Sequence, residues 1–156
     1  MREIHLRTSD LHKLATEVLA RGDRLRFRAR GNSMAPVIRH NDLVEVEPVA
    51  LDEVALGDIL FLHDERGRLL LHRLVGLLSG EGGLRVLAQG DALPVADDPV
   101  SGDLILGRVV ALQRRGRWSD SRAPKRWLVG RLRTLLAPYN HWLYPLTRRF
   151  HLRRRT

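Results

Sequence analysis

The chain has 156 residues, of which 44% are hydrophobic and 29% charged, and its formal net charge is +9 at pH 7. This length suits one domain with an appendage, and the absence of cysteine excludes disulfides, thiolate catalysis and cysteine-ligated zinc. Residues 1–10 hold no apolar signal-peptide core, and no window of about 18 apolar residues predicts a transmembrane helix.

The charge is divided unevenly along the chain. Residues 1–112 carry 14 Lys/Arg and 17 Asp/Glu, a net charge of −3, whereas residues 113–156 carry 13 and 1, a net charge of +12. A nearly neutral body followed by a strongly basic tail indicates two functional parts. We therefore predict a folded domain over 1–112 and a separate basic tail over 113–156.

The first predicted elements are a helix and a strand. Ser9 or Asp10 can cap a helix that runs to about Arg21 and ends at Gly22. One face of this amphipathic helix carries its apolar residues: Leu11, Leu14, Val18 and Leu19. Residues 24–30 then alternate arginine with apolar residues, which predicts a half-buried strand.

Several later segments also predict strands, separated by turn signals about every ten residues. They are residues 42–47, 59–63, 68–76, 84–88 and 103–112, and a long loop over 90–102 precedes the last of them. Many short strands with such spacing predict a mainly β fold, with an antiparallel, barrel-like body and one N-terminal amphipathic helix.

A tight turn follows the arginine-rich strand, with the sequence Gly-Asn-Ser-Met-Ala-Pro over residues 31–36. Pro36 suits the first turn of a short helix, which would place Ser33 near a helix N-terminus. A serine there has an exposed hydroxyl and nearby backbone N–H groups, as a nucleophile with an oxyanion site requires. The alternative is that Ser33 only caps the helix.

Two further segments complete a possible catalytic set. His72 lies inside an apolar strand, where the alternative is a core histidine with satisfied hydrogen bonds. Asp97 and Asp98 precede a proline, where the alternative is ordinary turn chemistry. Together these residues supply a nucleophile, a base and an orienting carboxylate in the chain order Ser, His, Asp, and a triad is defined by geometry rather than by order.

The order and spacing of these motifs resemble the signal peptidase I-like serine peptidases, a group that includes the self-cleaving domains of SOS-type repressors. The resemblance covers about residues 24–112. It rests on six segments: residues 31–36, 41–46, 57–61, 72–76, 90–98 and 105–109. The His-Arg pair at the base position resembles the endoplasmic-reticulum and archaeal type, where bacterial members have lysine. The resemblance implies the fold of that group and peptidase chemistry.

The resemblance also implies a role for each matching residue. Ser33 would be the nucleophile and His72 the general base. Asp98 would be the third residue, with Asp97 as the alternative because the loop is one residue longer than expected, and Asp91 would shape the turn. The predicted oxyanion and substrate-binding residues are Gly31, Asn32 and Met34, beside the nucleophile. Backbone N–H groups would form the oxyanion site. No metal or cofactor is predicted.

The tail over 113–156 interleaves arginines with large apolar side chains, including Trp118, Trp127 and Trp142. A basic, aromatic, amphipathic segment is typical of a helix at a membrane surface or of an arm that docks on a partner. A tail that packs on the body or is disordered is an alternative, and nucleic-acid binding is less favoured. We expect a cytoplasmic protein, held peripherally at the inner face of an anionic membrane.

The leading functional hypothesis is therefore a serine endopeptidase that cleaves an extended segment of a precursor peptide or protein. Such a segment would add as a strand beside residues 24–30. The alternatives are a peptide-binding module that does not cleave and a repressor-like autoprotease, although the sequence shows no N-terminal pair of DNA-binding helices.

Overall fold

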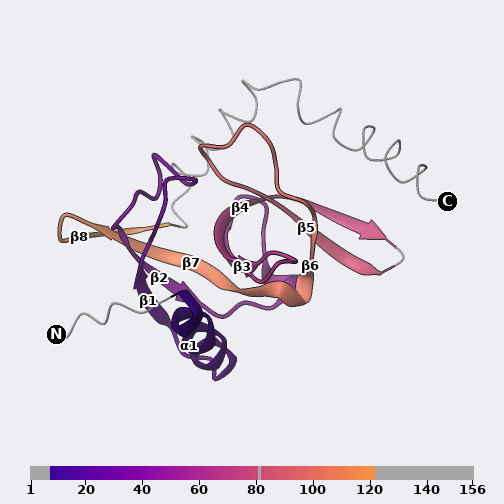
Figure 1. Ribbon diagram of the computed structural model, residues 1–156, viewed down its shortest axis with the longest axis horizontal. Coiled ribbons are helices and arrows are strands. Elements are labelled where there is room, and N and C mark those ends of the chain that lie inside the picture. The colour runs from indigo at the N-terminus through magenta and orange to yellow at the C-terminus, as the bar shows by residue number, and fades with distance from the viewer. Residues whose placement is uncertain (1–7, 81, 122–156) are drawn as a thin grey trace.

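The computed structural model describes residues 8–80 and 82–121, and within them one α-helix accompanies an eight-stranded antiparallel sheet (Figure 1). The elements are α1 (Thr8–Ala20), β1 (Leu25–Arg28), β2 (Leu43–Glu47), η1 (Leu51–Glu53), β3 (Ile59–His63), β4 (Leu69–Gly80), β5 (Gly83–Gln89), β6 (Val100–Ser101), η2 (Gly102–Leu104), β7 (Ile105–Arg114) and β8 (Arg117–Asp120), where η marks a 3₁₀ helix. None of the helices in these ranges has the length and apolar character needed to cross a membrane.

Helix α1 ends where the sequence predicts. Gly22 adopts a φ of 87°, and the amides of Gly22 and Asp23 donate to the carbonyls of Leu19 and Val18. This is the Schellman arrangement, which favours glycine because the left-handed conformation is strained for other residues. Leu14 is 38% exposed at the edge of the apolar face, and the buried position belongs to Ala15 instead.

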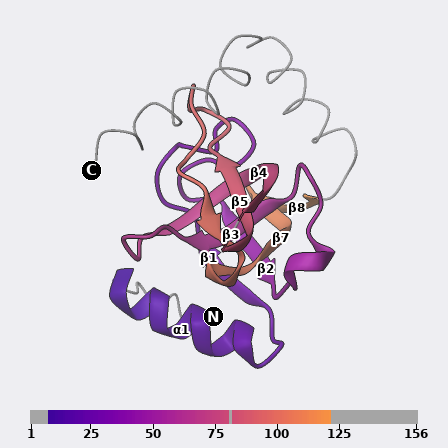
Figure 2. The ribbon, with the colours of Figure 1, turned by 90° about the vertical axis from the view of Figure 1, so that its right-hand side faces the viewer.

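The strands form one curled sheet in the order β1-β2-β7-β3-β4-β5-β6, and β8 pairs with β7. The mainly β prediction is confirmed, with the sheet curled as a half-barrel and α1 lying along one side of it (Figure 2). Within the described ranges β1 is an edge strand, because it pairs only with β2. The predicted peptide strand would pair with this edge.

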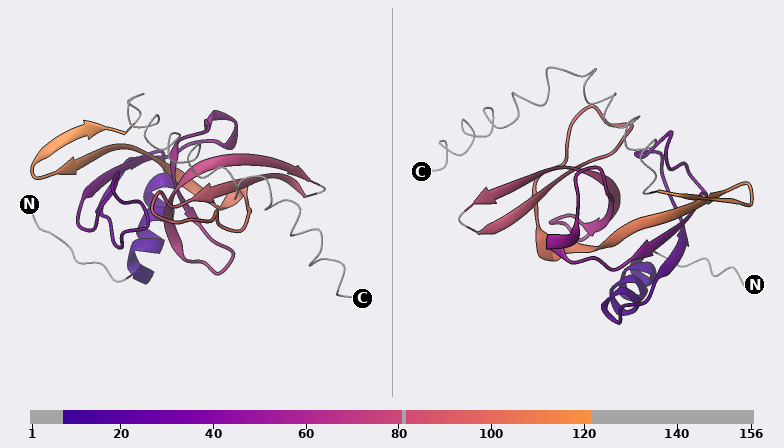
Figure 3. Two further views of the ribbon diagram at one scale, coloured as in Figure 1. Left: turned by 90° about the horizontal axis from the view of Figure 1, so that it is seen from above. Right: turned by 180° about the vertical axis from the view of Figure 1, so that it is seen from behind.

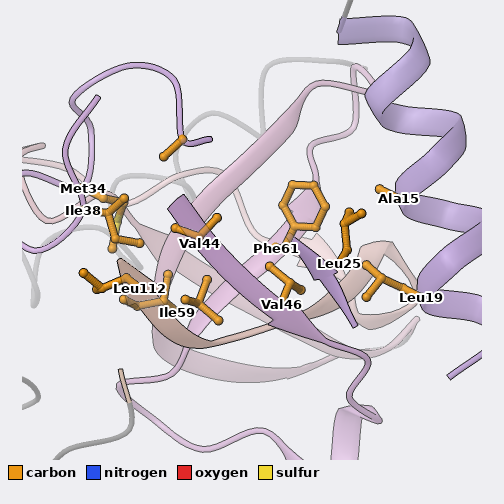
Figure 4. Packing of buried hydrophobic residues seen from close by; sticks show 12 residues of the cluster. Ala15, Leu19, Leu25, Met34, Ile38, Val44, Val46, Ile59, Phe61 and Leu112 are labelled. Carbon is orange, nitrogen blue, oxygen red and sulfur yellow. The ribbon is translucent and has the colours of Figure 1, made fainter. Parts of the chain in front are cut away.

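Strand β3 lies between two apolar cores and contributes to both. Ile59 and Phe61 belong to the larger core, which includes residues of α1, β1, β2 and β7; Leu60 and Leu62 belong to the smaller core under β4 and β5. Figure 4 shows the larger core, with Leu19 of α1 beside Leu25. A strand buried on both faces explains why the sequence here is continuously apolar.

The sheet continues past residue 112, the predicted boundary between body and tail. Strand β7 runs to Arg114, and β8 pairs with it through residues 117–120. Trp118 lies on β8, 43% exposed, with the Arg26 guanidinium 4.9 Å from its ring centroid. The β7–β8 and β4–β5 hairpins project at opposite ends of the molecule (Figure 3). The rest of the predicted tail, with its expected helix, lies outside the described residues.

Candidate active site

Ser33 lies in a pair of turns rather than at the start of the predicted helix. The Ala35 amide donates to the Asn32 carbonyl, and the Ile38 amide donates to the Met34 carbonyl. No helix forms, because the amides that would continue it donate elsewhere: that of Arg39 to the Asp42 carboxylate, that of His40 to the Asn32 side chain and that of Asn41 to the Ala29 carbonyl. The carbonyls of Pro36 and Val37 accept from the Arg114 guanidinium. The helix prediction is therefore wrong, and Ser33 does not act as an N-cap.

Asp42 and Arg114 hold this segment in place from behind. Asp42 is 5% exposed, and its carboxylate accepts hydrogen bonds from Arg114 and from the amide of Arg39. Burial alone would raise the pKa of Asp42, but these hydrogen bonds hold it below its ordinary value. The carboxylate is therefore ionised at neutral pH, and the ion pair ties the Ser33 segment to the end of β7.

His72 stands on β4, opposite Leu60 of β3, and is 4% exposed. Its Nδ1 contacts the Oδ2 of Asp97 in a short hydrogen bond. Because a carboxylate accepts, Nδ1 carries the proton, and Nε2 of the neutral imidazole is left as the acceptor. The histidine thus has the tautomer that a general base requires.

The structure joins His72 to Asp97 and not to Asp98, the residue preferred in the sequence analysis. The Asp97 amide donates to the Ala88 carbonyl of β5 at 2.8 Å, which fixes the backbone beside the sheet. Successive side chains of an extended segment point to opposite sides. Asp97 therefore faces His72, while Asp98 is exposed.

One loop, residues 90–99, links Ser33 to His72. The Ala92 amide donates to the Ser33 carbonyl at 2.8 Å, near the start of the loop, and Asp97 contacts His72 near its end. The approach at Gly90 is so close that an added Cβ would lie 2.7 Å from the Ser33 carbonyl oxygen. The fold thus brings Ser33, His72 and Asp97, which lie far apart in the sequence, to one region.

A buried ion pair fixes the loop below this region. Arg73 donates to both carboxylate oxygens of Asp91, at 2.8 and 2.6 Å, and to the Gly57 carbonyl at 2.7 Å. The two side chains are 8% and 9% exposed. The sequence predicts only a turn-shaping role for Asp91. Neighbouring residues on a strand face opposite sides, so the position of Arg73 next to His72 indicates that Arg73 faces away from His72. This adjacency was the available sequence signal for a second role on the same strand.

The backbone around Ser33 leaves amides available for a developing negative charge. Among the described residues, the amides of Asn32, Ser33 and Met34 donate no hydrogen bond, whereas the Gly31 amide donates to His40 Nδ1 at 3.3 Å. The Asn32 side chain accepts from the His40 amide, and the Met34 side chain is 3% exposed in the larger core. Of the four, Gly31 is thus the one whose amide is occupied.

A groove runs past Ser33 between the free edge of β1 and the beginning of β4. It contains a cavity of about 200 Å³, lined by residues 27–31 on one side and 69–71 on the other. Ala29 pairs with the chain before β2, so the backbone groups of Arg30 point away from β2 and toward the groove. The floor is apolar and includes Phe27, Met34 and Phe61.

Ser33 and His72 are not hydrogen-bonded to each other in this structure. In the described part of the chain, neither the Ser33 hydroxyl nor His72 Nε2 makes a hydrogen bond. Hydrogen bonds of this kind are often long without substrate and tighten when it binds. Over the same residues, no group of three or more histidines and carboxylates is placed to bind a metal ion.

No family model, curated protein or solved structure matches this chain.

Proposed function

We propose that this protein is a serine endopeptidase of the signal peptidase I-like type. Ser33 is the nucleophile, His72 the general base and Asp97 the orienting carboxylate. The observation that carries the proposal is the contact between His72 and Asp97, made by a loop that also binds the Ser33 carbonyl. A histidine in a core needs only a hydrogen-bond partner. Here the loop that contacts His72 also contacts Ser33, and among the described residues the amides of residues 32–34 donate no hydrogen bond.

The chemistry follows from the two ring nitrogens of His72. Nε2 takes the hydroxyl proton as Ser33 Oγ attacks the peptide carbonyl, and Nδ1–H stays bonded to Asp97, which stabilises the imidazolium. The amides of residues 32–34 then stabilise the oxyanion of the tetrahedral intermediate. His72 returns the proton to the leaving amine, and water releases the acyl group by the same route.

The substrate is an extended peptide that lies along the free edge of β1. Backbone groups at Arg30 pair with it, and its alternate side chains enter the apolar groove over Phe27 and Phe61. The cavity of about 200 Å³ limits these side chains to modest size. Affinity therefore comes mainly from the backbone, and specificity from the size of the groove.

The test is to incubate the full chain with a diverse peptide library and read cleavage by mass spectrometry, beside Ser33→Ala and His72→Ala variants. We expect wild-type cleavage, and loss of it in both variants with unchanged circular dichroism. Full turnover by Ser33→Ala would refute the proposal. Peptide binding without any cleavage by the wild type would favour the alternative, a binding module on the same groove.

A further inference from the structure

Four arginines gather on the side of the molecule where the β7–β8 hairpin meets the Ser33 segment. They line one surface hollow: Arg39, Arg114, Arg115 and Arg117. Arg114 is committed to Asp42, with hydrogen bonds of 2.5 to 3.1 Å. Among the described residues, Arg39, Arg115 and Arg117 form no side-chain ion pair, so positive charge here exceeds negative charge.

The backbone conformation and the charges of the β7–β8 turn both lower the stability of the fold. Arg114 pairs with Arg117, and the two residues between them, Arg115 and Gly116, have φ values of 51° and 76°. Two positive φ values make a type I′ turn, whose first central position favours asparagine, aspartate or glycine. A long side chain in the left-handed region costs roughly 1 kcal/mol, and like charges repel. Such departures at a turn point to a function.

An anionic surface is the occupant that these features fit. Arginine pairs with phosphate oxygens through two parallel N–H groups. The hairpin projects from the body (Figure 1), so its tip can meet a flat surface. The chain continues from this hairpin into residues 122–156, which hold ten Lys/Arg together with Trp127, Trp142 and several leucines. Cations with aromatic and aliphatic side chains suit a lipid interface better than a nucleic acid.

We propose that the arginine cluster at the β7–β8 turn, formed by Arg114, Arg115 and Arg117 together with Arg39 of the neighbouring Ser33 segment, docks on the phosphate headgroups of an anionic membrane. Ser121, the last residue that the structure describes, is held to β7, since its amide and hydroxyl donate to the Val110 and Val109 carbonyls. Arg114 also holds the Ser33 segment, so the bound membrane lies beside the groove.

The test uses the full chain and a variant that removes charge while improving the turn, Arg115→Asn with Arg117→Gln. The charge-matched control is Arg21→Gln with Arg66→Gln, two exposed arginines on other elements. Binding to phosphatidylglycerol vesicles is measured by co-sedimentation at low salt. Each surface arginine contributes about 1 kcal/mol, or fivefold, so we expect the turn variant to bind roughly 30-fold more weakly. The control should lose less than about threefold.

Two further measurements distinguish lipid headgroups from free phosphate and from the phosphates of a nucleic acid. Inorganic phosphate at the same phosphate concentration should fail to displace the protein from vesicles, and a single-stranded oligonucleotide should bind more weakly than vesicles do. Equal losses in the two variants, or vesicle binding unchanged by the turn variant, would overturn the proposal. Tighter binding to the oligonucleotide would replace it with a nucleic-acid surface, and displacement by free phosphate would reduce it to a small-anion site.

Discussion

Asp97 and Asp98 show how one position along an extended segment changes what a residue can do. The Asp97 amide is held by β5, and its side chain contacts His72, while Asp98 is exposed. Both residues carry the same charge, so a long-range electrostatic effect would be similar for the two. A hydrogen bond that fixes the imidazole tautomer is specific to Asp97.

The residue-scale prediction is that Asp97→Asn lowers kcat far more than Asp98→Asn. Asparagine at 97 can donate to Nδ1 and favour the wrong tautomer, so we expect a loss of about 10³–10⁴-fold. Asp98→Asn should change kcat by less than about threefold. Steady-state kinetics on a peptide identified from the library gives both values, and equal losses would show that Asp97 does not orient the base.

At the scale of elements, the loop over residues 90–99 is held to β4 by the Arg73–Asp91 pair. The pair is buried on both sides and its guanidinium also serves the Gly57 carbonyl. Removing one partner of such a pair leaves an uncompensated buried charge, which is the costly outcome. The loop that supplies Asp97 therefore depends on an interaction outside the site.

We predict that Asp91→Asn lowers the free energy of unfolding by about 3 kcal/mol. Glu65→Gln is the matched control, because it removes one carboxylate from an exposed pair with Arg85 and should cost less than about 1 kcal/mol. Urea denaturation followed by circular dichroism measures both. A cost for Asp91→Asn no larger than that of the control would mean that solvent screens the Arg73 pair.

A second element-scale contact joins α1 to the end of β3. His12 Nε2 lies 3.1 Å from His63 Nδ1. Burial, together with the neighbouring His12, holds the pKa of His63 below its ordinary 6.5, although Asp64 and the Gly67 backbone oppose this. Between the lowered pKa and 6.5 the unfolded chain binds more protons than the folded one. Stability therefore falls as the pH drops through that window.

We expect the Tm to fall between pH 7.5 and pH 5.5, and His63→Gln to reduce that fall because it removes the titrating group. Thermal unfolding at both pH values provides the measurement. An identical pH dependence in His63→Gln and wild type would assign the effect to other groups.

At the scale of the whole molecule, the sheet forms one unit that includes β8, while most of the +12 charge follows β8 in the sequence. The sequence-based division of the chain is therefore best tested at residue 121, after the Ser121 hydrogen bonds to β7. We predict that residues 1–121 keep the wild-type Tm within about 3 °C and keep peptidase activity. Vesicle binding should fall at least tenfold, since ten Lys/Arg are removed. A much lower Tm would instead indicate that the tail packs on the body.

Patterns of neighbouring residues determined the local structure of this protein. Alternation gave the edge strand that includes Leu25 and Phe27, and Gly22 ended the helix, because these signals act within a few residues and depend on φ, ψ and side-chain direction. The motifs around Ser33 and His72 likewise identified both candidate residues before their positions in space were known.

Tertiary structure decided what depends on contacts between distant segments. The helix expected after Ser33 is absent because the Arg39 amide, which would continue it, donates to the Asp42 carboxylate, and Arg114, 72 residues beyond Asp42, holds that carboxylate in place. Asp97 rather than Asp98 meets His72 because pairing with β5 sets which side chain faces inward. No periodicity encodes such choices: each is fixed by hydrogen bonds that form only when the sheet curls and brings the partners together.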